Sequence, residues 1–442
     1  MKIQLSDHFS YRRLLSFCLS PIIMMVFTSI YGVVDGLFVS NFVGKVPFAA
    51  INLVMPFIMI LGGVGFMVGT GGSALVAKTL GEGDRERANR YFTMMIWLTV
   101  ILGVVLSVVG IVFMRPISRL LGATDDMLED CVAYGRTLMG FNTAFMLQNV
   151  FQTFLVTAEK PKIGLLATVS AGVTNMALDA LFIAGFGWKV EGAAVATGLS
   201  NCIGGLLPLI YFLRPNKSLL RLTKTRLEIK ALLKACANGS SELMSNISGS
   251  LVSMLYNFQL LRFAGEDGVA AYGVLMYIQF IFIAVFIGYV IGTAPVVGYH
   301  YGAQNHAELR NVRRKSTVLM GAAGIIMMVL AQCLAAPLAK LFVGYDQGLF
   351  EMTRHAFFIF SFSFLLAGFN IFTSSFFTAL NNGAVSAAIS FLRTLVFQMV
   401  SVLILPVFFD LDGIWWAITV AEVFAAMISA GFLLLKRKKY HY

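Results

Sequence analysis

Two aspartates stand inside long apolar stretches, where a charge is expensive. A carboxylate at the centre of a bilayer costs roughly 2.5–3.5 kcal/mol on insertion scales. Asp179 follows Asn175 by four residues, so both side chains project from one face of a helix. Carboxylate and amide oxygens can share a proton or bind a small cation, and Thr197 in the next stretch adds a hydroxyl. The sequence therefore predicts a site for H⁺ or Na⁺ formed by Asp35, Asn175, Asp179 and Thr197.

Other roles stay open for polar residues in these stretches. Each aspartate could be an inert packing contact, and Thr197 alone could bond to its own helix backbone. Glu242, near the start of a later stretch, is a candidate to line a substrate cleft, or else an interfacial charge that reaches back to water. Arg393 lies inside an eleventh stretch and requires a partner, or water, that the sequence does not name.

The composition places the chain in a bilayer. Hydrophobic residues make up 58% of it, charged residues only 12%, and the mean hydropathy is +0.81, whereas soluble domains carry about 25% charged residues. The net charge of +11 does not indicate a nucleic-acid partner, because the basic residues cluster in short loops between apolar stretches. The five cysteines stand alone, so neither a metal site nor a redox pair is expected.

About twelve stretches are long enough to cross the hydrocarbon. Lys and Arg concentrate in alternate loops, which predicts that both termini face the cytoplasm. The membrane expected is the cell (inner or plasma) membrane. The expected spans lie near 14–40, 48–77, 91–113, 131–157, 163–187, 192–213, 235–262, 269–300, 316–342, 354–380, 384–409 and 413–435.

The second half of the chain repeats the first at an offset of 221 residues, half of 442. Six spans return a chain to its starting side, so the halves are parallel repeats related by an axis along the membrane normal. Asp35 falls on Tyr256 and Asp179 on Val400, so a coupling site belongs to the first half. The matching pairs include Phe48-Ala49-Ala50 with Val269-Ala270-Ala271, Gly81 with Gly302, Asp84 with Asn305, Asn149 with Asn370, and Gly192 with Gly413.

These repeats predict two lobes, 1–213 and 235–442, joined by the linker 214–234. The linker interleaves leucines with basic residues, which fits either a cytoplasmic helix on the membrane surface or a solvated tether. The fold class expected is an all-α membrane protein with two six-helix lobes and a pseudo-two-fold axis.

Four segments resemble the multidrug and toxic compound extrusion (MATE) family. They are the first-span pattern that ends in Asp35, LGEGDRERANR at 80–90, NMALDALFIAGFGWKVEGAAVATG at 175–198, and DGIWWAITVAEVF at 412–424. The resemblance implies two lobes that form a V around a large cleft, and efflux of organic cations driven by inward H⁺ or Na⁺. It also implies a first-lobe cation site, whose family positions read Asp35, Asn175, Asp179 and Thr197 here.

Some members of that family also use second-lobe acids on the seventh and tenth spans. Glu242 fits the first position, but the tenth span offers only Glu351 at its entrance, which departs from the pattern.

The hypothesis is a cation-coupled antiporter that exports amphipathic, mostly cationic organic compounds by alternating access. It is expected to be a monomer, not an enzyme, with no cofactor beyond its coupling ion. The alternative, a lipid-linked oligosaccharide flippase of the same fold, should have a strongly cationic cleft. Only Arg136, Arg354 and Arg393 lie within the expected spans, against three acids, which disfavours this alternative. A membrane-embedded enzyme would need a catalytic cluster at one membrane face, and the sequence shows none. A passive channel is a further alternative, which differs from an antiporter because it could not concentrate a substrate.

Overall fold

The structure, a computed structural model, describes residues 3–43 and 45–442, without the side chains at positions 37, 40, 41 and 45. Residues 1, 2 and 44 of the expected first lobe lie outside this description. The described chain is helical, because a helix satisfies every backbone donor and acceptor within one membrane segment. In chain order the helices are α1 (Tyr11–Phe42), α2 (Lys45–Gly81), α3 (Arg85–Leu120), α4 (Asp125–Gly140), α5 (Asn142–Thr157), α6 (Pro161–Asp179), the π-helix η1 (Ala180–Gly185), α7 (Lys189–Leu213), α8 (Ile229–Gly302), α9 (His306–Val343), α10 (Gln347–Ser361), α11 (Phe364–Ala379), α12 (Gly383–Phe391), the π-helix η2 (Leu392–Val396) and α13 (Phe397–Tyr440).

Two of the long helices reverse direction internally. In α8 the backbone breaks at Gly265, with φ 63°, and the rings of Tyr256 and Tyr272 then stack with centroids 5.0 Å apart. Sixteen residues of straight helix would separate them by about 24 Å. In α13 the break falls at Asp410, with φ 47°. Each of these helices therefore crosses the bundle twice.

The helices give the number of passes that the sequence predicts. Within the described residues, eight helices are long and apolar enough to cross a membrane, or nine when the pair α10–α11, bent by 49°, counts as one. The reversals in α8 and α13 add two passes. The pair α4–α5, interrupted only at Phe141, supplies another. The described chain thus makes twelve passes. Each expected span falls on one of them, although 163–187 runs past the end of η1 at Gly185 and 354–380 past the end of α11 at Ala379.

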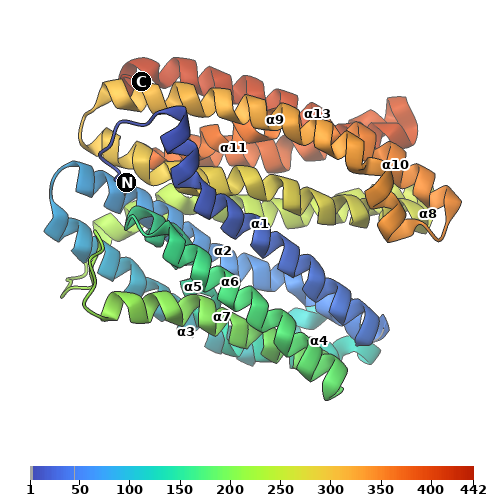
Figure 1. Ribbon diagram of the computed structural model, residues 1–442. Helices are drawn as coiled ribbons and strands as arrows, with labels where there is room; N and C mark the ends of the chain where they lie inside the picture. The colour runs from blue at the N-terminus through green and yellow to red at the C-terminus, as the bar shows by residue number, and fades with distance from the viewer. Residues whose placement is uncertain (1–2, 44) are drawn as a thin grey trace.

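The passes form two lobes, as expected. Helices α1 to α7 make the first and α8 to α13 the second, with both termini at the same end (Figure 1). We call this the terminal end and the opposite one the far end. One hydrophobic cluster fills most of the second lobe and two smaller ones fill the first. The terminal part of α1 packs into the second-lobe cluster through Phe17 and Cys18.

Glycines let the two lobes touch backbone to backbone near the terminal end. A methyl group on any of them would overlap a carbonyl oxygen of the facing helix, so only glycine fits. These contacts join α2 of the first lobe to both passes of α8. The pairs are Gly71 with Ala235, Gly239 with Met67, Gly81 with Tyr299, and Gly302 with Lys78.

The segment before α1 also joins the lobes at the terminal end. The Leu5 amide donates to Glu159 of the first lobe over 2.9 Å. In the second lobe, Glu308 accepts from the Phe9 amide at 2.9 Å and contacts His8 Nδ1 at 2.6 Å. Leu5 and Phe9 are fully buried. The segment therefore lies across the seam between the lobes.

The linker is neither of the two alternatives that the sequence left open, a surface helix or a solvated tether. Residues 214–228 are not helical, and helix resumes only at Ile229. The linker lies along α3, where the Arg221 amide donates to Asn89 Oδ1 at 2.9 Å and the Thr223 amide to Thr93 Oγ1 at 3.0 Å. Specific hydrogen bonds to α3 replace the bonds that a helix would have made within itself, so the linker is an ordered strap rather than a solvated tether.

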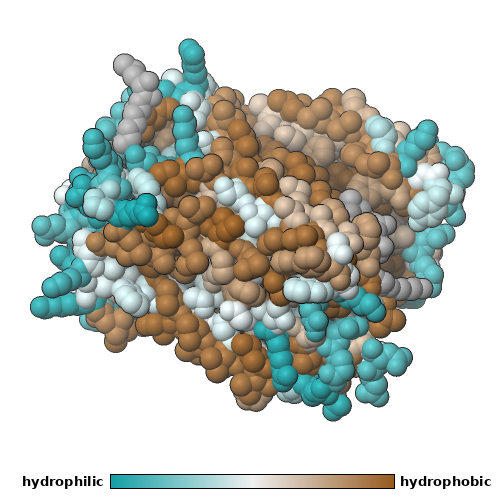
Figure 2. Space-filling model, turned by 60° about the horizontal axis from the view of Figure 1, so that its bottom comes forward, coloured by the Kyte–Doolittle hydropathy of each residue, from teal (hydrophilic) through white to brown (hydrophobic). Residues whose placement is uncertain are grey.

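The surface fits a protein embedded in a bilayer. Figure 2 shows a broad hydrophobic belt between hydrophilic patches at the two ends of the molecule. Valines on α3 contribute to the exposed apolar surface, with Val104, Val108 and Val112 each more than half exposed. The buried faces of such helices hold small and polar residues that bring neighbours together.

Candidate functional site

Three helices of the first lobe bring the four predicted residues into one cluster. Asp35 lies on α1, Asn175 and Asp179 on the last turns of α6, and Thr197 on α7. The carboxyl groups of Asp35 and Asp179 are close neighbours, and the Asn175 amide lies beside Asp35. Asn175 Nδ2 is also 3.5 Å from Thr197 Oγ1.

The cluster is rich in oxygen acceptors and poor in donors. Among the described side chains, Asp35 Oδ1, both carboxyl oxygens of Asp179 and Asn175 Oδ1 are buried without a hydrogen-bond donor. Two ionised carboxylates cannot donate to each other, so neither aspartate satisfies the oxygen atoms of the other. A buried polar group left unsatisfied costs about 1–3 kcal/mol, and more when charged. A shared proton or a small cation would satisfy these oxygens.

The local structure places Asp179 at a change of helix type. Helix α6 begins at Pro161, where the missing amide hydrogen costs nothing, and ends at Asp179. The π-helix η1 follows directly, and such segments occur frequently at functional sites. Within η1, Phe182 stacks on Trp188, which directly precedes α7, with centroids 5.1 Å apart, and this contact anchors the far end of the pass.

Tyrosines that the sequence analysis did not single out surround the carboxyl pair. The Tyr31 hydroxyl lies within reach of Gln148, and Tyr134 lies near both aspartates. Tyr277 comes from the second lobe, with its hydroxyl 3.5 Å from the Cβ position of Gly36 and its ring near Asp35. The only signal in the sequence was a polar atom within an apolar span, and many tyrosines share it.

Glu242 belongs to another part of the molecule. It lies on the first pass of α8, one turn beyond Gly239, which contacts α2. Its side chain is partly buried, and the structure does not add it to the first-lobe cluster. Its role in a substrate cleft therefore stays a prediction.

Arg393 has a partner that the sequence analysis missed. Its Nη2 lies 2.7 Å from Glu422 Oε1 in α13, and Asn370 Nδ2 donates to Glu422 Oε2 over 2.6 Å. Glu422 is 2% exposed, so the spans hold a fourth acid beyond the three counted from the sequence. The signal was present, because a carboxylate in an apolar span needs a cation.

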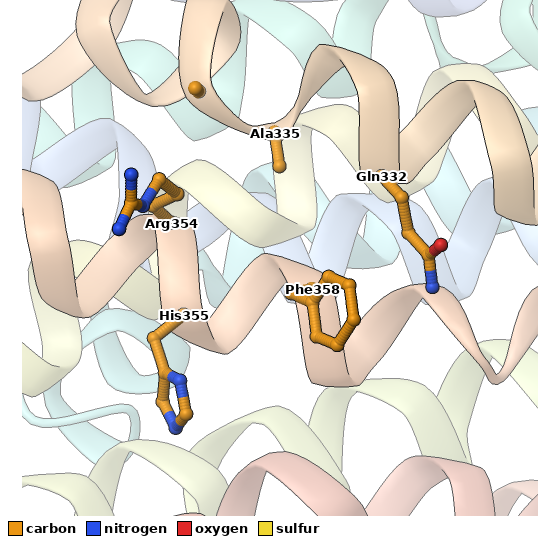
Figure 3. A pocket seen from close by; sticks show the side chains of 6 residues that line it. Gln332, Ala335, Arg354, His355 and Phe358 are labelled. Carbon is orange, nitrogen blue, oxygen red and sulfur yellow. The ribbon is translucent and has the colours of Figure 1, made fainter.

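The other two arginines assigned to spans lie at exposed positions. Arg136 donates to the Ile111 carbonyl at 3.0 Å, and Arg354 pairs with Glu351 at 2.8 Å. Arg354 also lines a cavity of about 310 Å³ between α9 and α10, with His355, Phe358 and Gln332 (Figure 3). A second cavity, of about 180 Å³, lies between the linker and α3. Neither is lined by the carboxyl pair, so the large cleft expected between the lobes stays a prediction.

The family assignment follows from the sequence as a whole. The MatE family model matches residues 21–181 and again residues 243–404, once in each lobe. The chain belongs to the MatE family. Membership makes it a multi-pass membrane transporter rather than an enzyme.

Relatives of this MatE protein extend over its full length. It is 23% identical over 430 residues to the multidrug export protein MepA of Staphylococcus saprophyticus, covering 97% of this chain and 94% of that one. Among solved structures it resembles a MATE protein in complex with MaL6, with TM-score 0.93, 23% identity and 98% of each chain covered. It equally resembles an outward-facing multidrug resistance MATE family transporter, with TM-score 0.93, 23% identity, and coverage of 98% and 97%. These likenesses establish the two-lobed fold of the MatE protein.

Proposed function

We propose that this MatE protein is a cation-coupled antiporter whose coupling ion binds at Asp35 and Asp179. The supporting observation is the pair of adjacent carboxyl groups, buried among oxygen acceptors that lack donors. A proton bridges two such carboxyls directly. For Na⁺, Asp35, Asp179, Asn175 and Thr197 offer carboxylate, amide and hydroxyl oxygens, which hard cations prefer. The cluster is therefore compatible with either ion.

Ion binding acts on the shape of the first lobe. Without an ion, repulsion between the carboxylates opposes close packing of α1 against α6. With an ion bound, the two helices can approach each other. The lobe then changes shape, and its affinity for the substrate falls. A ligand shifts a conformational equilibrium only by its difference in affinity for the two states, so Asp35 and Asp179 must lie closer together in one state than in the other.

We infer that the exported compounds are amphipathic and mostly cationic. The support comes from the relatives, since MepA proteins of similar length are named as multidrug exporters. The chain also supplies 39 Phe, 22 Met and 14 Tyr residues, whose polarisable side chains suit adaptable apolar sites. Glu242 is the candidate to attract a cation in the cleft.

We further propose that the terminal end faces the cytoplasm. Basic segments meet at this end in the structure. Lys315, near the start of α9, donates to the Phe9 carbonyl at 2.7 Å, and Tyr440, directly after the basic run 436–439, contacts Tyr301 with ring centroids 5.6 Å apart. An excess of Lys and Arg marks cytoplasmic loops. Because the glycine contacts close this end, the described conformation is the one closed to the cytoplasm.

The decisive experiment is transport by the purified full chain in proteoliposomes, with a pH gradient or a Na⁺ gradient imposed separately. Ethidium accumulation that requires one of these gradients identifies antiport and names the ion. Asp35→Asn and Asp179→Asn are expected to reduce gradient-driven accumulation by about a hundredfold, corresponding to about 3 kcal/mol of lost coupling. Asp267→Asn, at an exposed position beside the break in α8, serves as control.

Two results would overturn the proposal. Ethidium that equilibrates without either gradient, yet is never concentrated, would indicate a passive channel. Parental accumulation by both aspartate variants would remove the carboxyl pair from the mechanism.

A further inference from the structure

The second lobe contains a buried carboxylate that the proposed cycle does not use. Glu422 Oε1 accepts from Arg393 Nη2 at 2.7 Å and from Nε at 2.9 Å. Its Oε2 accepts from Asn370 Nδ2 at 2.6 Å and from the same Nε at 3.0 Å. Both oxygens are thus fully engaged with side-chain donors of the protein itself, and Asn370 additionally bonds to the Glu422 carbonyl at 3.0 Å.

Burial makes this arrangement dependent on the arginine. The side chain of Glu422 is 2% exposed and that of Arg393 16% exposed. Removing one partner from a buried ion pair leaves an uncompensated charge, which is strongly unfavourable. A guanidinium keeps its charge at every pH of interest, so the carboxylate holds a permanent cation.

The first-lobe cluster has the opposite composition. Asp35 and Asp179 face each other with oxygen atoms that have no donor among the described side chains. No arginine or lysine side chain forms an ion pair with them in the described part of the chain. The first lobe therefore needs a cation from outside, whereas the second already contains one.

Both clusters occupy the same region of their lobes. In each lobe the fifth and sixth passes contribute: α6 and α7 in the first, and η2 and α13 in the second. The offset of 221 places Arg393 over Gly172, where even a methyl group would lie 2.7 Å from the Tyr31 ring. In each lobe a π-helix lies on the fifth pass beside the cluster. The first-lobe position that corresponds to Arg393 therefore has no room for an arginine side chain.

We infer that the Arg393 guanidinium is the built-in cation of the second lobe. It keeps Glu422 ionised and paired throughout the cycle, so the second lobe takes up no coupling ion and exchange is driven through the first lobe alone. This assignment rests on the proposed antiport for its consequence, but the state of Glu422 can be measured without transport.

Infrared spectroscopy of the full chain in Na⁺-free buffer reports protonated carboxyl groups through their carbonyl stretch. The charge-free pair Arg393→Met with Glu422→Gln should leave the parental protonated-acid band unchanged, because Glu422 contributes nothing to it. Arg393→Met alone should add the band of one carboxylic acid, which disappears when Glu422→Gln is added. Arg393→Lys, which keeps the charge, should give the parental spectrum.

Two spectral outcomes overturn the inference. One is a weaker acid band in the charge-free pair than in the parent, which would show that Glu422 carries a proton in the native protein. The other is an unchanged band in Arg393→Met, which would show that the carboxylate does not need the guanidinium. If Arg393→Met does not fold, the charge-free pair and Arg393→Lys still decide, since well-packed neutral replacements of buried ion pairs are often tolerated.

Transport gives the second readout. In proteoliposomes with equal amounts of protein, the charge-free pair should retain gradient-driven ethidium accumulation within about twofold of the parent. A loss as deep as that of Asp179→Asn, in a charge-free pair that melts like the parent, would show that the second lobe is ion-loaded. If the parent itself shows no gradient-driven transport, the proposed antiport fails, and the infrared result still stands as the test of the pair.

Discussion

Gly81 and Gly302, one in each lobe, lie at equivalent positions and contact each other's helices. Gly81 lies against the carbonyl of Tyr299, and Gly302 against that of Lys78. The two contacts are exchanged by the offset of 221 residues, so they are the direct expression of the pseudo-two-fold axis. At this point the lobes approach without side chains between them, which makes the closed terminal end sensitive to a single added methyl group.

Gly302→Ala is expected to open the terminal end. The new methyl group would overlap Lys78 O and force α2 and α8 apart. The measurement is the rate at which a membrane-impermeant maleimide labels Cys236, which follows the interface residue Ala235, in a variant whose other four cysteines are alanine. We expect a rise of about fivefold or more, the change that follows from about 1 kcal/mol.

Gly249→Ala is the matched control, because Gly249 lies on the same helix with open space at its Cβ position. Unchanged labelling in Gly302→Ala would show that the terminal end accommodates the added methyl group without separation of the lobes.

Asn175→Ala should weaken the coupling ion without abolishing transport. Its amide supplies an oxygen and a donor beside Asp35, but the carboxyl pair remains. One hydrogen bond contributes about 1 kcal/mol, so the ion concentration for half-maximal transport should rise about fivefold. Thr197→Val, which preserves shape and removes the hydroxyl, should give a similar or smaller rise. The concentration dependence of initial ethidium transport measures both, and a loss of maximal rate with unchanged half-saturation would contradict this role.

Glu308→Ala should release the segment before α1. Glu308 receives the Phe9 amide, His8 Nδ1 and Asn311 Nδ2, the last at 2.8 Å. Losing these bonds costs about 1–3 kcal/mol, so amides of residues 5–9 should exchange hydrogen about five- to hundredfold faster. Glu86→Ala, at an exposed position in the first turn of α3, is the control. Equal exchange in the two variants would mean that apolar burial of Leu5 and Phe9 alone holds the segment.

Asn89→Ala should loosen the linker. The variant removes the acceptor of the Arg221 amide, and the basic linker then becomes a better substrate for trypsin. We expect cleavage within 214–228 to accelerate about threefold to tenfold, consistent with one lost hydrogen bond of about 1 kcal/mol. Thr99→Val is the control on the same helix, because Thr99 bonds only to the Met95 carbonyl of α3. Cleavage that is as slow in Asn89→Ala as in the parent would show that the leucines hold the strap.

The passes and the aspartate pair were accessible from sequence for physical reasons. A bilayer demands long apolar helices, so the spans are visible as runs, and it penalises charge, so Asp35 and Asp179 stand out. Their mutual contact depended on the resemblance to a family, because spacing alone does not bring α1 to α6. The Glu422 pair was not predicted, although a carboxylate in an apolar span is equally conspicuous, because nothing in the spacing of Arg393 and Glu422 along the chain brings their side chains together.

The linker shows a different limit. Leucines that alternate with basic residues fit a surface helix, but the choice between helix and strap depends on acceptors located elsewhere. Asn89 and Thr93 offer those acceptors from α3, more than a hundred residues away. The π-helices are likewise invisible in the sequence, because an additional residue in a helical turn leaves no compositional signature.

The buried segment before α1 has a practical consequence for handling the protein. A purification tag fused at the N-terminus would disturb the packing of Leu5 and Phe9, which are buried in the seam between the lobes. One fused after Tyr442 would displace a ring that is 2% exposed and packs on Phe376. Tyr345 is 83% exposed in the turn between α9 and α10. A short epitope inserted there would report on expression while leaving both chain ends undisturbed.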